Sequence, residues 1–364
     1  MPLQILTLTY PLMPLTRDAC GGVEQVAFTL LHRLAARQQP LQLITIADAG
    51  SRVPGKLIPN DYKNECGLAE IRLRRRTERM LELAEPLARA SDLIHLQGFN
   101  EWRPVAAWGK PTFWTLHMAF SLYPPGWLDG IPPNLKPICI SSTQARLLAL
   151  RLPPAETARS GGEPDWIGNG IELDRFDWRQ PRSDYWLYLG RICPEKGVHN
   201  AIELAQRSQR HLILAGGVYP FPSHQEYFRQ KIAPRLGPDV LWVETPPFEQ
   251  KLELLARAAA VVICTEVEEP SSLTAMEAAA SGAPVLALRR GALAEIIRHG
   301  ESGILASDLE ELAAGAKQLA GISAFSCRRQ AEQNFSAAAM AENYWQLFQQ
   351  ATAAAKCGEL SRAA

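Results

Sequence analysis

Two glutamates separated by seven residues, Glu269 and Glu277, stand where the chain changes from loop to predicted helix. Glu277 lies about one turn into the helix, which begins near Ser272. A helix N-terminus presents unpaired N–H groups and a positive dipole end, so the backbone of Ser272, Leu273 and Thr274 can hold a phosphate. Glu277 can then accept hydrogen bonds from ribose hydroxyls, and Glu269 can contact what extends past the phosphates. The spacing alone slightly favours a plainer interpretation, an ordinary surface helix with acidic residues near its start.

Two basic residues lie in a turn bounded by glycines, between a predicted strand and a predicted helix. The turn reads Gly190-Arg191-Ile192-Cys193-Pro194-Glu195-Lys196-Gly197. A guanidinium and an ammonium group at the carboxyl end of a strand can neutralise a diphosphate leaving group in place of a metal ion. A loop with solvated basic residues is the plainer alternative, although two cations at this position are less common than one.

The N-terminal half contributes a glycine pair and a histidine. Gly21 and Gly22 follow a predicted strand and lack Cβ atoms, so backbone there can approach a ligand closely. They do not form the G-x-G-x-x-G pattern of nicotinamide-binding proteins, and no clear acidic residue ends the second strand. His117 follows the strand 113–116 and can hydrogen-bond a sugar, although a lone histidine more often has a structural role.

Composition excludes several classes of protein. The 38 Lys and Arg residues balance 38 Asp and Glu residues, so no global charge favours nucleic acid, and 47% hydrophobic residues suit a packed core. The N-terminus lacks the basic start of a signal peptide, and no apolar run is long enough to span a membrane. We expect a soluble, cytoplasmic protein without a metal site. The cysteines, expected to be free thiols because none has disulfide or zinc spacing, are Cys20, Cys66, Cys139, Cys193, Cys264, Cys327 and Cys357.

Short apolar runs alternate with helical stretches, which is typical of parallel sheets covered on both faces. We expect an α/β fold of two Rossmann-like, doubly wound domains, residues 1–180 and 181–364, with a polar linker near 177–184. Ligands of such sheets bind at the carboxyl ends of the strands, so the two domains are expected to face each other across a cleft. A helix near 336–350 carries an apolar stripe, and the segment after it is expected to be a frayed tail.

The predicted elements position these residues at strand ends and helix starts. The predicted strands are 4–9, 41–46, 93–96, 113–116, 137–140, 185–189, 212–214, 241–243, 261–264 and 284–288. The predicted helices are 23–37, one from about 143 capped by Ser141 and Ser142, 198–208, 249–259, 273–281, 293–299 and 336–348.

Together these residues resemble the retaining glycosyltransferases of group 1, or family 4, which have the GT-B fold. The family's E-x7-E signature is similar to Glu269–Glu277, and its G-R-x-x-x-E-K-G motif is similar to Gly190–Gly197. The order and spacing of the motifs make chance a poor explanation. Further similar segments are Gly21–Glu24, Asn169–Ile171, Gly282–Val285, Glu295 with Gly300 and Gly303, and Phe335–Tyr344, which resembles the terminal helix that crosses back to the N-terminal domain.

The resemblance implies a retaining, metal-independent transfer of a hexose from a nucleoside diphosphate sugar, most commonly a UDP-sugar, to an acceptor hydroxyl. The acceptor would be a sugar, a lipid-linked molecule or a small molecule, and no cofactor is expected. The roles it implies are diphosphate binding by Arg191 and Lys196, ribose binding by Glu277, sugar contacts from Glu269 and His117, backbone contacts near Ser272, Leu273 and Thr274, and access for the diphosphate at Gly21 and Gly22.

The sequence departs from the family pattern at two places beside the site. Ser271-Ser272 stands where the family usually has Phe-Gly, and Arg289-Arg290-Gly291 departs from its Gly-Gly. Serine is small enough to allow the ligand to approach, but its hydroxyl can alter selectivity for the sugar.

Three other functions are alternatives to transfer. A sugar-nucleotide epimerase would convert the donor alone, a non-catalytic partner protein would bind the donor without transfer, and a nicotinamide dehydrogenase is disfavoured by the missing fingerprint. Loops of the first domain that include Trp102, Tyr123 and Trp127 are expected to shape the acceptor pocket, where these rings either stack on a sugar or pack together. The basic run from Arg72 to Arg76 can attract an anionic membrane surface, although a solvated helix face is favoured.

Overall fold

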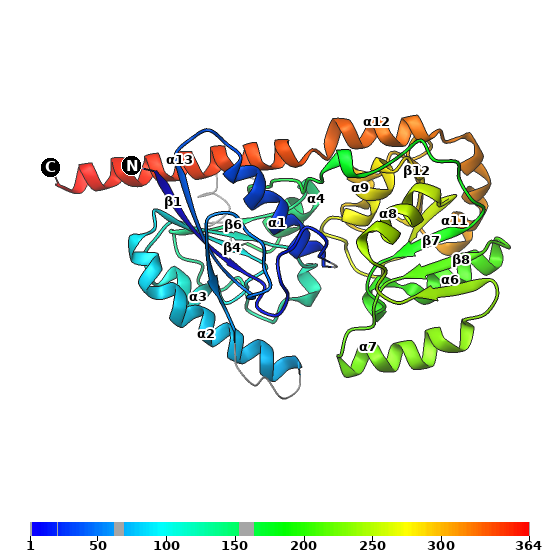
Figure 1. Ribbon diagram of the computed structural model, residues 1–364, viewed down its shortest axis with the longest axis horizontal. Helices are drawn as coiled ribbons and strands as arrows, with labels where there is room; N and C mark the ends of the chain where they lie inside the picture. Colours follow the sequence, from blue (N-terminus) through cyan, green and yellow to red (C-terminus); the bar gives the residue numbers. More distant parts are fainter. Residues whose placement is uncertain (1, 20, 62–68, 153–163, 364) are drawn as a thin grey trace. The chain divides into compact units, whose positions relative to one another are not determined.

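The structure is a computed structural model that describes residues 2–19, 21–61, 69–152 and 164–363. Contacts within the chain divide it into two compact units. Unit 1 comprises Met1–His117, Tyr123–Gly170 and Ala337–Ala364, and unit 2 comprises Met118–Leu122 and Ile171–Ser336. Each unit is built on its own parallel sheet (Figure 1). The C-terminal helix therefore belongs to the unit that contains the N-terminus.

The sheet of unit 1 has six strands in the order β3-β2-β1-β4-β5-β6, and every pairing is parallel. Its central strands are mostly apolar and almost entirely buried because helices cover both faces of a parallel sheet. The strands are β1 (Leu3–Thr9), β2 (Leu41–Ala47), β3 (Lys56–Pro59), β4 (Leu93–Gln97), β5 (Thr112–Thr115) and β6 (Leu135–Ile138); the helices are α1 (Gly22–Ala35), α2 (Ala69–Ala90), α3 (Trp102–Ala106), α4 (Ser142–Ala149) and α13 (Ala337–Ala363).

The sheet of unit 2 repeats this plan with the strand order β9-β8-β7-β10-β11-β12, again entirely parallel. Its strands are β7 (Trp186–Leu189), β8 (Leu212–Ala215), β9 (Val240–Val243), β10 (Ala260–Ile263), β11 (Val285–Leu288) and β12 (Gly303–Ala306). The helices and helical turns are η1 (Phe120–Leu122), η2 (Leu173–Arg175), η3 (Pro194–Lys196), α6 (Val198–Arg207), α7 (Pro222–Tyr227), η4 (Phe228–Ile232), η5 (Ala233–Arg235), α8 (Phe248–Arg257), α9 (Leu273–Ala280), α10 (Leu293–Ile296), α11 (Leu309–Gly315), η6 (Ala316–Gly321) and α12 (Ala324–Asn334).

Numbered from the first strand of each unit, both sheets have the order 3-2-1-4-5-6 of the Rossmann fold. In such a sheet the chain runs outward in opposite directions from strands 1 and 4, and ligands bind beyond the carboxyl ends of these two strands. The corresponding pairs are β1 with β4 in unit 1 and β7 with β10 in unit 2. The prediction of two doubly wound α/β units is confirmed.

The C-terminal helix α13 packs on α1 within unit 1. Arg37 Nη1 lies 2.6 Å from the Glu342 carboxylate, and the Arg37 guanidinium lies 5.2 Å from the centre of the Trp345 ring. Tyr344 and Phe348 are buried on the same helix. These contacts confirm that the terminal helix joins the N-terminal unit, and the helix runs to Ala363 where a frayed tail was predicted after 350.

Each predicted strand is present with bounds that differ by one or two residues, whereas β3 and β12 were not predicted. Both are four residues long, and each lies at an edge of its sheet. Helix α10 is shorter than predicted and ends at Ile296. Ser141 caps α4 as predicted, because its hydroxyl accepts a hydrogen bond from the Gln144 N–H at 3.1 Å. Within the described part of the chain, none of the helices is long and apolar enough to cross a membrane.

Candidate functional site

The loop between β10 and α9 in unit 2 carries the first predicted glutamate and the start of the predicted phosphate-binding helix. Ser272 caps α9, and its hydroxyl accepts a hydrogen bond from the Ala275 N–H at 3.3 Å. The Thr274 hydroxyl donates to the Leu189 carbonyl at 3.2 Å, which fixes the helix start against the end of β7. The N-terminus of α9 therefore lies at the carboxyl edge of the sheet, between the two strands where the fold places its ligands.

Glu269 and Lys196 form a partly buried ion pair in unit 2. Lys196 Nζ lies 2.8 and 2.9 Å from the two carboxylate oxygens, and Glu269 is only 6% exposed. Lys196 owes its position to Gly197, which has φ +60°. A Cβ at Gly197 would lie 1.9 Å from the Cys264 carbonyl oxygen, so only glycine fits this close approach of the β7–α6 turn to the end of β10. The structure thus brings together the two sequence motifs that were predicted to share one site.

Glu277 has a second lysine as its partner. Lys251 Nζ, on α8, lies 2.6 Å from the Glu277 carboxylate, and the two side chains are 11% and 3% exposed. The Lys251 ammonium also lies 5.3 Å from the centre of the Phe248 ring. Sequence reasoning missed Lys251, because a single lysine in an amphipathic helix gives no signal of its partner. Each glutamate of the pair Glu269–Glu277 therefore has its own ammonium group.

Arg191 is more accessible than the two lysines. Its guanidinium lies 3.3 Å from the Glu195 carboxylate and 5.7 Å from the centre of the Tyr219 ring, and its side chain is 37% exposed. Because Arg191 follows β7 and Lys196 lies in the same turn, unit 2 holds both predicted diphosphate ligands in one segment. Cations fixed in a partly buried site stabilise phosphate charge more strongly than cations in water.

The departure at Arg289-Arg290-Gly291 keeps the one glycine that the backbone needs. Gly291 has φ +53°, and a Cβ there would lie 2.3 Å from the Glu269 carbonyl oxygen. Its N–H donates to the Glu268 carboxylate at 2.6 Å, while Ala292 N–H donates to the Glu269 carbonyl at 2.8 Å. Gly291 therefore holds the backbone of Glu269 in place, and Arg290 does not have the positive φ that would require glycine.

The second departure, Ser271, is a buried hydroxyl next to the helix start. Ser271 is 8% exposed, and its Oγ has no hydrogen-bond partner among the residues that the structure describes. A buried hydroxyl without a partner costs free energy, so such groups in a site are commonly satisfied by a ligand.

In unit 1, His117 belongs to a buried chain of neutral hydrogen bonds. His117 Nε2 lies 2.5 Å from the Gln97 amide oxygen, and the Gln97 amide nitrogen lies 3.2 Å from His95 Nε2. His95 Nε2 lies 2.9 Å from the Thr115 hydroxyl, which lies 3.0 Å from the Tyr344 hydroxyl on α13. The chain connects the ends of β4 and β5 to the C-terminal helix within the unit. Sequence analysis singled out only His117 of these five residues.

With the Gln97 amide oriented as it is in the structure, its two contacts assign one tautomer to each histidine. Gln97 donates its amide N–H to His95 Nε2, so this nitrogen holds a lone pair, and the Gln97 oxygen accepts the N–H of His117 Nε2. Burial, together with the neighbouring His117, lowers the pKa of His95 to about 3, and burial lowers the pKa of His117 to about 4. Both rings are therefore neutral at pH 7, and His117 suits a hydrogen-bonding role better than a cationic one.

Gly21 and Gly22 lie at the start of α1, after β1. Gly21 is the N-cap and has no side chain to cap the helix, so N–H groups of the first turn are left for other acceptors. A Cβ at Gly21 would lie 1.8 Å from a carboxylate oxygen of the buried Glu24. The acid thus fills the space beside the glycine, and an anion at this helix start requires the Glu24 side chain to turn away.

The aromatic residues expected to shape the acceptor pocket pack on one another. The rings of Tyr123 and Trp127 are stacked with centroids 4.4 Å apart, and Trp114 meets both edge to face. The Trp102 indole N–H donates to the Trp127 carbonyl at 3.0 Å. Packing is therefore the observed role of these rings, and a sugar-stacking role is not needed to explain them.

One residue of the basic run on α2 forms an ion pair within unit 1, because Arg76 Nη1 lies 2.5 Å from the Asp48 carboxylate. Contact of this helix with an anionic membrane surface stays a prediction.

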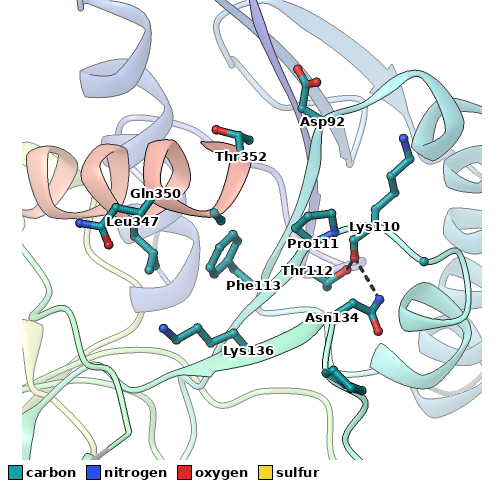
Figure 2. Close-up of a pocket in the computed structure, with 13 residues that line it drawn as sticks. Asp92, Lys110, Pro111, Thr112, Phe113, Asn134, Lys136, Leu347, Gln350 and Thr352 are labelled. Atoms are coloured by element: carbon teal, nitrogen blue, oxygen red, sulfur yellow. Dashed lines mark hydrogen bonds between the residues drawn. The ribbon is translucent and has the colours of Figure 1, made fainter. Parts of the chain in front are cut away.

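A pocket of about 700 Å³ in unit 1 lies away from all predicted site residues (Figure 2). It opens at the start of β5 and β6, near Thr112 and Lys136, and α13 covers one side with Leu347. Asn134 lines it and donates to the Lys110 carbonyl at 3.0 Å (Figure 2). Because His117 follows the opposite end of β5, this pocket is distinct from the carboxyl edge where the fold places its ligands.

Comparison with known proteins agrees with this geometry. The sequence model of the family "Glycosyl transferases group 1" matches residues 171–334. A D-inositol 3-phosphate glycosyltransferase from Streptomyces scabiei is 30% identical over 82% of this chain and 77% of its own. Among solved structures, a sucrose-phosphate synthase from Thermosynechococcus elongatus matches with a TM-score of 0.75 at 20% identity, covering 97% of this chain and 100% of its own. The structure of Anabaena Alr3699/HepE in complex with UDP-glucose matches with a TM-score of 0.71 at 16% identity, covering 96% and 100%.

The alignment with the Streptomyces scabiei enzyme is long enough to include both units. The family model matches unit 2, where the two lysine–glutamate pairs lie. The solved structures, at lower identity, support the two-sheet fold. The chain therefore belongs to the group 1, or family 4, glycosyltransferases, enzymes with the GT-B fold that use nucleotide-sugar donors.

Proposed function

We propose that the protein transfers a hexose from a UDP-sugar to an acceptor hydroxyl with retention at the anomeric carbon and without a divalent metal. The observation that supports this most directly is the pairing of Glu269 with Lys196 and of Glu277 with Lys251 at the carboxyl edge of unit 2. The pairs combine the two chemistries that a nucleotide sugar requires, acceptors for hydroxyls and cations for phosphates.

Arg191, Lys196 and the start of α9 would bind the donor diphosphate. Negative charge grows on the diphosphate as the glycosidic bond breaks, so fixed cations stabilise the transition state more than the ground state. When a phosphate engages Lys196, the Glu269 carboxylate is released to accept hydrogen bonds from the hydroxyls of the transferred sugar. The buried Ser271 hydroxyl gives the donor one further hydrogen-bond partner.

Lys251 would act as a positioning residue for Glu277. Its ammonium holds the carboxylate at 2.6 Å with both side chains buried, so one orientation of the carboxylate is fixed before the donor binds. The second carboxylate oxygen remains for ribose hydroxyls. A preorganised acceptor reduces the entropy that binding must otherwise overcome.

Retention follows if the leaving phosphate takes the acceptor proton on the same face of the sugar that the acceptor attacks. At the end of β5, His117 is held as a hydrogen-bond donor through Nε2 and its pKa is lowered to about 4, so it is a poor base for attack from the opposite face. His117 would present its Nδ1 lone pair to a sugar hydroxyl.

The relatives named as D-inositol 3-phosphate glycosyltransferases make inositol phosphate the first acceptor to assay. Donors should be screened before acceptors, with UDP-, GDP- and ADP-sugars compared by thermal shift, because a ligand that binds the folded state raises Tm by mass action. The donor found is then incubated with and without acceptor, and the anomeric configuration of the product is read by NMR.

The expected result is stabilisation by UDP-sugars and an acceptor-dependent product that keeps the donor's configuration. Sugar conversion without acceptor would replace the proposal with the epimerase alternative. Tight donor binding without transfer to any acceptor would favour the non-catalytic partner. Inversion at the anomeric carbon would overturn the retaining mechanism.

A further inference from the structure

Three side chains of different elements in unit 2 converge beside the turn that carries Arg191. Cys193 and Glu195 come from the turn after β7, and His224 comes from α7. The thiol sulfur, one carboxylate oxygen and one imidazole nitrogen all lie within 4.8 Å of one another. The fold thus brings a thiol, a carboxylate and an imidazole together, although the spacing of the three residues in the sequence is not that of a metal-binding motif.

The environment of the cluster indicates a ligand. Cys193 is fully buried and His224 is 8% exposed, and Nδ1 of His224 is buried without a hydrogen-bond partner among the described residues. Buried imidazole nitrogens in folded proteins normally have a partner, so this nitrogen has an unused lone pair or proton. Phe221 lies edge to face with the His224 ring at 5.2 Å, and Tyr219 lies at 6.5 Å, so aromatic rings surround the imidazole.

The three donor types select among cations. Zinc takes cysteine sulfur at about 2.3 Å and histidine nitrogen or carboxylate oxygen at about 2.0–2.2 Å, usually in a tetrahedron. In such a tetrahedron neighbouring ligand atoms lie about 3.3–3.7 Å apart, so separations of up to 4.8 Å need to close by at most about 1.5 Å. Magnesium and calcium prefer an all-oxygen set, so one thiol and one imidazole disfavour them.

We propose that Cys193, Glu195 and His224 form a zinc site with three protein ligands and a fourth position for water. The metal links the turn after β7 to α7, two segments of unit 2 that are distant in sequence. The thiol loses its proton to solvent as the metal binds. The Arg191 guanidinium, 3.3 Å from Glu195, is the nearest opposing charge, and it has to give up this carboxylate when the metal takes it.

The site shares its turn with Arg191, so its test uses no donor or acceptor and its outcome does not depend on the transfer reaction proposed above. The full-length chain, purified without metal, is titrated with Co²⁺, which occupies zinc sites and gives a thiolate-to-cobalt charge-transfer absorption when a cysteine binds it. The expected result is one Co²⁺ per chain with this absorption, displaced by one equivalent of Zn²⁺. Zn²⁺ should also raise Tm by mass action.

Variants assign the ligands. Cys193→Ser should abolish the charge-transfer absorption, and His224→Gln should weaken Co²⁺ affinity at least tenfold and remove the Tm increase with Zn²⁺. Cys327→Ser is the matched control, because Cys327 is an equally buried cysteine of unit 2 outside the cluster, and it should behave as the wild type. If Cys193→Ser fails to fold, Glu195→Gln replaces it, with the same tenfold loss expected.

Absence of the absorption with equimolar Co²⁺ would overturn the proposal. So would a spectrum that persists in Cys193→Ser, since another thiol would then be the ligand, or one that His224→Gln leaves unchanged.

Discussion

The two units share one strand order, yet the candidate residues at their strand ends differ in chemistry. In unit 2 the residues at the carboxyl ends of β7 and β10 are charged, and each buried glutamate has a lysine within 2.9 Å. In unit 1 the residues at the ends of β4 and β5 are neutral and joined by hydrogen bonds, from His117 to Tyr344. The fold therefore fixes where ligands bind, while the side chains decide what each unit can stabilise.

The difference has consequences for energetics. Removing one partner of a buried ion pair leaves an uncompensated charge and costs about 3–5 kcal/mol, whereas a neutral hydrogen bond contributes about 0.5–1.5 kcal/mol. Substitutions in unit 2 should therefore affect both stability and chemistry, and they need compensated variants to separate the two. Substitutions in unit 1 should each change the free energy of unfolding by a small amount and should alter its dependence on pH.

The largest effect is expected from Lys196→Met in unit 2. Loss of one cation from the leaving diphosphate should lower kcat/KM at least 100-fold, or about 3 kcal/mol of transition-state stabilisation. The measurement is steady-state transfer at limiting donor. Lys317→Met is the control, since Lys317 is an exposed lysine of the same unit.

A second variant separates chemistry from folding. Lys196→Met alone leaves Glu269 buried and charged, so Tm should fall, whereas Lys196→Met/Glu269→Gln should recover Tm without recovering turnover. Near wild-type turnover in either variant would show that the charged residues of unit 2 are not needed for the transfer reaction.

Lys251→Met should have the next largest effect and should act on donor binding. Without its ammonium, Glu277 loses the fixed orientation that suits ribose, so KM for the donor should rise about tenfold while kcat changes less, which corresponds to about 1.4 kcal/mol. Lys251→Arg, which keeps the charge, should recover part of the affinity. An equal loss of kcat with unchanged KM would mean that Lys251 acts on the transition state instead of positioning Glu277.

Much of unit 2 could be predicted from the sequence because its signals are local. The spacing of Glu269 and Glu277, and of Arg191 and Lys196, lies within single strand–turn–helix segments, where a residue's neighbours are set by the chain itself. Lys251 was missed because its partner lies on a different helix. The same reason hid the cluster of Cys193 with His224, whose spacing carries no metal signature.

Unit 1 was harder to predict because its site is a network across elements. His117 stood out as a histidine that follows a strand. His95 and Thr115 lie inside mostly apolar strands, so the pattern indicated only that they belong to the sheet. The sequence pattern placed Tyr344 in the apolar stripe of the terminal helix, because it cannot indicate which residue the tyrosine hydroxyl contacts. Positions of strands could be predicted from apolar runs, whereas hydrogen bonds between them depend on which side chains the register brings together.

The buried histidines of unit 1 predict a stability that depends on pH. Unfolded histidine has a pKa near 6.5, whereas the pKa of folded His95 is about 3 and that of His117 about 4. Between these values the unfolded chain binds more protons than the folded one, so the stabilisation is complete above about pH 6.5 and is lost as the pH falls. Each neutral histidine should contribute about 1.4 kcal/mol per pH unit to the slope.

The measurement is urea unfolding of the wild type and of His95→Gln between pH 7 and pH 4.5. The free energy of unfolding of the wild type should fall more steeply with decreasing pH, so that the two curves approach each other by about 1.4 kcal/mol per pH unit. Parallel curves would show that His95 has the same pKa in the folded and the unfolded chain and that its ring is not held neutral by unit 1.

The smallest effect is expected at the far end of the unit 1 network, in Tyr344→Phe. The variant keeps the ring packing against His95 and Phe348 and removes only the hydroxyl that lies 3.0 Å from Thr115, so it should cost about 1 kcal/mol. A double-mutant cycle with Thr115→Val isolates this bond, because both single variants lose it and the double variant loses it only once. Urea unfolding at pH 7 should give a coupling energy near 1 kcal/mol. Additive losses would mean that the hydrogen bond between Tyr344 and Thr115 adds nothing to the stability of unit 1.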